Sequence, residues 1–66
     1  IEDYFQMIIE SKVNGQISQL TSQLHELSKP QLKEFIKYCD MCLRYHTTSA
    51  SADYYEYCKS VSIDML

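Results

Sequence analysis

The apolar residues of this 66-residue chain recur at steps of three and four positions, the spacing of one face of an α-helix. Between residues 28 and 46 such residues lie on two sides of the predicted helix. A helix that covers only one core needs a single apolar stripe, so this helix is predicted to lie between neighbours or to offer its second side to a partner. The first stripe contains Leu32, Phe35, Ile36, Cys39, Leu43 and His46, and the second contains Tyr38, Met41 and Tyr45.

The first 27 residues are predicted to form one long helix, over about residues 2–27. Its apolar seam has heptad-like spacing, but near the N-terminus apolar side chains nearly encircle the helix, which requires that this part be covered. Asn14-Gly15 is the weak point, because an interior glycine costs about 1 kcal/mol relative to alanine. A break or kink there is the alternative. The seam is Val13, Ile17, Leu20, Leu24 and Leu27, and the encircling residues are Ile1, Tyr4, Phe5, Met7, Ile8 and Ile9.

The segment Ser28-Lys29-Pro30-Gln31 predicts the start of a second helix, over about residues 29–46. Ser28 can cap this helix, and Gln31 three residues later can close a capping box. Proline is tolerated in the first turn, because its missing N–H would be unpaired there. Leu27 and Leu32 are placed to form a hydrophobic staple across the cap. The first two helices are therefore expected to form an antiparallel hairpin.

Small polar residues at 47–51 predict a loop before a short third helix, over about residues 52–64. Ser51 is the expected cap of this helix. The three helices alternate in charge: residues 1–27 carry −3, residues 28–46 carry +2 and residues 47–66 carry −2. The middle helix is thus matched to both neighbours, which influences orientation more than stability. The inward stripe of the third helix contains Tyr54, Cys58, Val61 and Met65.

These patterns predict a single all-α domain over residues 1–66, a small three-helix bundle. A chain this short buries only about 60% of its unfolded surface. Its apolar residues are spread over more faces than one small bundle covers, so we expect self-association to complete the fold.

Three cysteines, an odd number, argue against a secreted disulfide framework and favour a reduced, intracellular and cytoplasmic setting. The longest apolar runs fall well short of the roughly 18 residues of a membrane span, so no membrane association is expected. The net charge of −3 makes nucleic acid a less favoured partner than protein.

A zinc-stabilised domain is one alternative, because Cys39, Cys42 and His46 share a helix and carry preferred zinc ligands. Cys58 or His25 would complete four ligands. The Cys-x-x-Cys pair lacks the turn that normally converges two sulfurs, and free cysteine is common in ordinary cores. We therefore expect packed thiols, with no metal and no cofactor.

Cys42 and His46 are also spaced as a possible nucleophile and base. No residues nearby resemble an oxyanion site or a glycine-rich loop, and a small helical domain leaves little room for a pocket. The chain is predicted to be no enzyme and to have no catalytic residues.

A basic stripe follows one flank of the middle helix. One interpretation is contact with phosphate or an acidic partner. The other is a solvent-exposed side whose positive charge complements the acidic neighbouring helices. A small nucleic-acid-associated regulator that uses this stripe is the second alternative function. The stripe contains Lys29, Lys33, Lys37 and Arg44.

Six tyrosines are dense for this length, and tyrosine combines a large apolar body with a polar tip, which suits interfaces. The function favoured is a non-enzymatic module for protein–protein interaction or oligomerisation, in a regulatory or adaptor role. Its partner would be a second copy of the chain, another protein, or both. The expected partner surface is Tyr4, Phe5, Ile8, Tyr38, Met41 and Tyr45.

Overall fold

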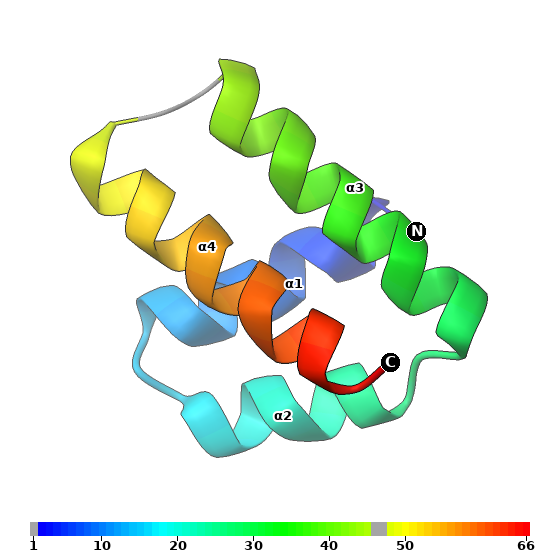
Figure 1. Ribbon diagram of the computed structural model, residues 1–66. Coiled ribbons are helices and arrows are strands. Elements are labelled where there is room, and N and C mark those ends of the chain that lie inside the picture. Colours follow the sequence, from blue (N-terminus) through cyan, green and yellow to red (C-terminus); the bar gives the residue numbers. More distant parts are fainter. Residues whose placement is uncertain (1, 46–47) are drawn as a thin grey trace.

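The computed structural model describes residues 2–45 and 48–66, which fold into four α-helices (Figure 1). The prediction of an all-helical chain is confirmed, but the described residues form four helices and not three. α3 and α4 lie side by side and make the most extensive contact, while α1 packs behind them and α2 crosses beneath. The helices are α1 (Glu2–Val13), α2 (Ile17–His25), α3 (Lys29–Tyr45) and α4 (Ser49–Asp64).

The expected long helix over residues 2–27 is wrong, because the chain breaks at Gly15. Gly15 has a φ of +75°, in the left-handed region that glycine adopts without steric cost. Its N–H donates to the Lys12 carbonyl at 3.0 Å, and the Gln16 N–H donates to the Ser11 carbonyl at 2.8 Å. These two bonds are those of a Schellman motif with glycine just past the helix end. The turn folds α2 back against α1.

The capping box predicted at the start of α3 is confirmed. The Ser28 N–H donates to Oε1 of Gln31 at 2.9 Å, and the Gln31 N–H donates to Oγ of Ser28 at 3.4 Å. The predicted antiparallel hairpin across this turn is replaced by two pairs of helices that are adjacent in sequence, α1 with α2 and α3 with α4. The reason is the Gly15 turn, which gives α1 a partner before α3 begins.

α4 begins earlier than expected. Thr48, not Ser51, caps it: Thr48 has extended backbone, and its Oγ1 accepts from the Ser51 N–H at 3.3 Å. Residues 49–51, expected in a loop, are the first turn of α4. Threonine and serine are both good N-caps. A start at Thr48 adds a turn of helix that contains neither glycine nor proline, the two residues that destabilise a helix most. Thr47 lies outside the described residues.

The core is formed where all four helices meet. The Phe5 and Phe35 rings meet edge to face with centroids 5.2 Å apart, and the Tyr38 ring lies 5.7 Å from that of Phe5. None of the described helices is both long enough and apolar enough to cross a bilayer. The buried cluster contains Phe5, Ile8, Ile9, Leu20, Leu24, Leu32, Phe35, Cys39 and Cys58.

Candidate functional site

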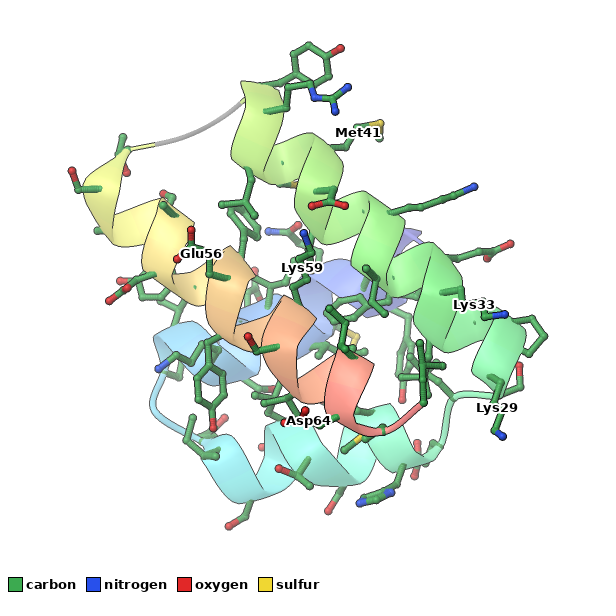
Figure 2. All side chains as sticks on the ribbon, viewed as in Figure 1. Lys29, Lys33, Met41, Glu56, Lys59 and Asp64 are labelled. Carbon is green, nitrogen blue, oxygen red and sulfur yellow. The ribbon has the colours of Figure 1, made fainter. Side chains whose placement is uncertain are left out.

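The outer face of α3 is the side of this helix that points away from the core. We define it by Lys33, Lys37, Met41, Arg44 and Tyr45, all exposed; the exposed carboxylate of Glu34, two turns before Met41, lies on the same side. Met41 is 52% exposed and Tyr45 is 69% exposed, although both are large apolar side chains. Figure 2 shows Lys33 and Met41 projecting from α3 on the side away from α4. α3 therefore has one apolar side in the core and a second, mixed side open to solvent.

A shallow hollow of about 290 Å³ lies on this face, lined by Lys37, Asp40, Met41 and Arg44. Asp40 accepts from the Lys59 ammonium of α4, and this is the single ion pair found among the described residues. The cations of the outer face of α3 are thus exposed and form no ion pair among the described residues. The hollow combines one apolar side chain with two available positive charges.

The structure divides the six residues predicted to form the partner surface. Phe5 and Ile8 are 3% and 0% exposed, so they belong to the core. The sequence showed an apolar N-terminal helix that had to be covered, but not that α2, folded back at Gly15, would help to cover it. Met41 and Tyr45 stay on the surface.

Tyr4 and Tyr38 are half-buried and anchor α1 to its neighbours. The Tyr4 hydroxyl lies 3.1 Å from a carboxylate oxygen of Glu26, and the hydroxyl of Tyr38 donates to Oε1 of Gln6 at 2.8 Å. Partial burial and the hydrogen bond to Glu26 raise the pKa of Tyr4. Both tyrosines use their ring for packing and their polar tip for a bond within the chain.

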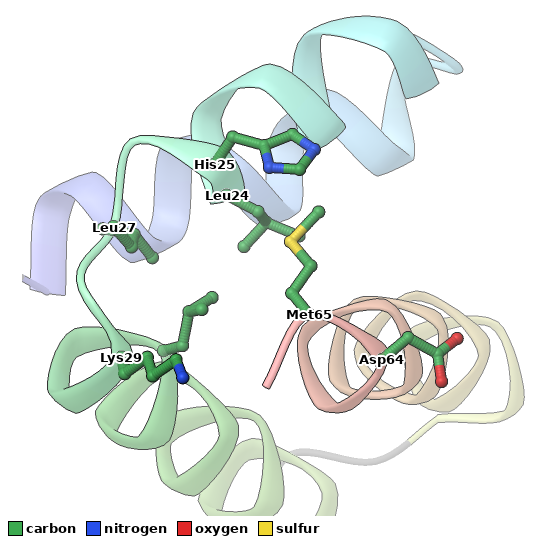
Figure 3. A pocket seen from close by; sticks show the side chains of 7 residues that line it. Leu24, His25, Leu27, Lys29, Asp64 and Met65 are labelled. Atoms are coloured by element: carbon green, nitrogen blue, oxygen red, sulfur yellow. The ribbon is translucent and has the colours of Figure 1, made fainter.

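The predicted basic stripe is also divided. Lys33, Lys37 and Arg44 lie on the outer face of α3, whereas Lys29 lines a different hollow, where the ends of α2, α3 and α4 meet (Figure 3). That hollow has a volume of about 350 Å³ and an apolar floor that includes Leu24. Sequence reasoning missed it, because it arises only where three helix ends converge. Its other lining residues are His25, Leu27, Leu32, Asp64 and Met65.

The three cysteines are buried at the α3–α4 contact with free thiols. Burial raises the pKa of Cys39 far above its usual range and raises the pKa of Cys58 to about 11. Both thiols are therefore protonated at neutral pH, which disfavours their use as nucleophiles or metal ligands. Across residues 2–45 and 48–66, no group of three or more His, Cys, Asp or Glu side chains is placed to hold a metal ion. His46 lies outside the described residues.

A second charged surface lies on α4. We define the outer face of α4 as Asp53, Glu56, Ile63 and Asp64, all exposed, with Ile63 49% exposed. Asp64 also lines the hollow where the helix ends meet, and Figure 3 shows its carboxylate projecting from α4 on the side away from α3. The helix predicted over residues 52–64 already contains these four residues, but sequence reasoning used the acids as a match for the middle helix and did not consider them as one face.

Comparisons of the chain with protein-family models, with curated proteins and with solved structures found no match.

Proposed function

We propose that the chain is a non-enzymatic protein-interaction module that docks a partner through the outer face of α3. The observation that carries the proposal is the exposure of Met41 and Tyr45 on a helix whose opposite side is already in the core. Neither side chain belongs to the buried cluster or is among the partly buried residues packed against it. Both are residue types that interfaces favour, methionine for its adaptability and tyrosine for its large amphipathic ring.

The charges around these two side chains favour an acidic protein partner. Lys37 and Arg44 flank Met41 in the hollow and form no ion pair among the described residues. Asp40 lines the same hollow but is paired with Lys59. Cations at the rim of an interface steer an oppositely charged partner and fix its orientation more than they add affinity. A nucleic acid would use the same cations, but Glu34 and Asp40 lie on the same helix and the chain carries −3 overall. A protein surface is therefore the better match.

The test places a photo-crosslinking residue on the proposed surface and on a control surface. In the variant Met41→p-benzoylphenylalanine the probe lies on the outer face of α3. In the control Ser18→p-benzoylphenylalanine it lies on the exposed side of α2. Both proteins are irradiated alone and in an extract of the source cells.

We expect protein adducts from position 41 and few from position 18. Unlabelled wild-type protein should compete for these adducts, and the variant Met41→Ser/Tyr45→Ser should compete poorly, since it lacks the apolar contacts. Equal labelling from both positions, or equal competition by both competitors, would overturn the proposal.

A further inference from the structure

We infer that the partner seated on the outer face of α3 is a second copy of this chain, which contributes the outer face of its α4. This inference rests on the proposed function and names the occupant of the same surface. The contact is head to tail: the basic face of one copy meets the acidic face of the next.

The fold distributes charge unevenly between α3 and α4. α3 is mainly basic and α4 mainly acidic, yet the ion pair that joins them uses Asp40 of α3 and Lys59 of α4. Each helix thus contributes its minority charge to the internal contact. The majority charges of both helices are exposed, with no ion pair to each other among the described residues. One chain therefore presents two outward faces of opposite sign.

The charges of the two outer faces span equal lengths of helix. Lys33 and Arg44 are the first and last cations of the outer face of α3, and Asp53 and Asp64 are the first and last acids of the outer face of α4. Both pairs are separated by the same number of helical positions, which corresponds to about 16 Å. When the two helices lie alongside each other in separate copies, charges at both ends can therefore meet at once.

Each face also exposes one apolar side chain. Met41 lies between Lys37 and Arg44 in the hollow on α3, and Ile63 lies beside Asp64, near the end of the α4 face. About half of each residue's surface is exposed in the single chain. Contact between copies that removes these side chains from water would add apolar burial to the charge pairing.

The two faces are different surfaces, so the contact is heterologous and need not stop at a dimer. Ion pairs at an exposed rim are individually weak and are screened by salt over about 8 Å at physiological ionic strength. We therefore expect weak, salt-sensitive association in which the mean size keeps growing with concentration.

The test is a charge swap with purified protein, measured by sedimentation velocity. The variant Lys33→Glu/Lys37→Glu reverses α3, and the variant Asp53→Lys/Glu56→Lys reverses α4. Each variant alone should lose association, because its two outer faces then carry the same sign. An equimolar mixture should associate again, because the acidic α3 of one variant matches the basic α4 of the other.

Wild-type protein should associate at low salt, with an apparent dissociation constant that rises by roughly tenfold towards 0.5 M salt. Lys29→Glu and Lys33→Glu form a matched pair: both reverse an exposed lysine of α3, but only Lys33 lies on its outer face. Only Lys33→Glu should weaken the association. Circular dichroism of every variant checks that the helices are intact.

Wild-type protein that stays monomeric at low salt and high concentration would overturn the inference, as would a mixture of the two swapped variants that does not associate. The crosslinking experiment separates this failure from failure of the proposed function. If position 41 captures only a different protein from the extract, the second copy is excluded and docking through the outer face of α3 stands. If it captures nothing specific, both fail.

Discussion

At the scale of single residues, Gly15 determines the path of the chain more than any other position. Its positive φ ends α1 and directs α2 back across it. A Cβ at this position would have no described heavy atom within 4 Å. The cost of adding a Cβ at this position is therefore conformational and not steric.

We predict that Gly15→Ala lowers the free energy of unfolding by about 1 kcal/mol, the penalty for an L-residue in the left-handed region. Gly15→Asn should cost less, because asparagine tolerates this conformation. Urea denaturation followed by circular dichroism measures both. Equal stability of the alanine variant and the wild type would contradict the Schellman turn.

Burial of the thiols predicts a loss of stability at alkaline pH. The pKa of Cys58 is raised from 9.0 to about 11 in the folded chain, so between these values the folded state retains a proton that the unfolded state has lost. Stability is thus fully present below pH 9 and falls as the pH rises towards 11. Cys39 shifts in the same direction because of its burial.

The measurement is the free energy of unfolding in urea at several pH values, with a reductant present. Cys58→Ala should show a shallower loss between pH 9 and 11 than the wild type, whatever its absolute stability. The slope and not the midpoint is the readout, because the substitution also removes packing. Identical slopes would show that this thiol titrates normally.

At the scale of the helices, sequence reasoning succeeded where the signal is local and failed where two local signals compete. The capping box joins Ser28 and Gln31, which are three positions apart, and it is found as predicted. At residues 48–51 two good caps stand three positions apart, and the sequence does not rank them. At Gly15 the sequence contains two opposing signals, a glycine that destabilises a helix interior and an apolar seam that continues past it. The chain breaks there because α2 then packs on α1, and this packing cannot be recognised from the neighbouring residues alone.

The corrected start of α4 makes a prediction about its cap. Thr48→Ala should cost about 1 kcal/mol of stability, since it leaves the Ser51 N–H without its partner. Ser51→Ala should cost less, because Ser51 lies inside the first turn and its backbone donor is unaffected. Thermal or urea denaturation of both variants decides between the two caps. A larger loss for Ser51→Ala would restore the helix start predicted from the sequence.

At the scale of the whole molecule, the fold separates apolar residues that look alike in the sequence. Phe5 and Met41 were both expected at a partner surface, but one is in the core and the other is exposed. Of the six residues predicted to form the partner surface, only Met41 and Tyr45 are exposed. The sequence showed which residues are apolar, but it did not show how four helices share them.

This difference predicts that truncation of the buried ring costs much stability and truncation of the exposed side chains costs little. Phe5→Ala should lower the free energy of unfolding by about 3–5 kcal/mol, because it removes a ring packed against Phe35. Met41→Ser/Tyr45→Ser should change stability by no more than about 0.5 kcal/mol per site, as surface substitutions do. Circular dichroism and urea denaturation give both values. Loss of helicity in the Met41 and Tyr45 variant would place these side chains in the fold itself and remove the case for docking.

The pairing of helices that are neighbours in the sequence has a kinetic consequence. α1 finds α2 across the short turn at Gly15, and α3 and α4 are likewise consecutive. Each hairpin closes only a small loop before it gains contacts, and topologies of this kind reach the native state in microseconds to milliseconds. Folding and unfolding after a temperature jump should therefore be complete within the mixing time of a stopped-flow instrument. Newly synthesised chains would expose their apolar faces only briefly.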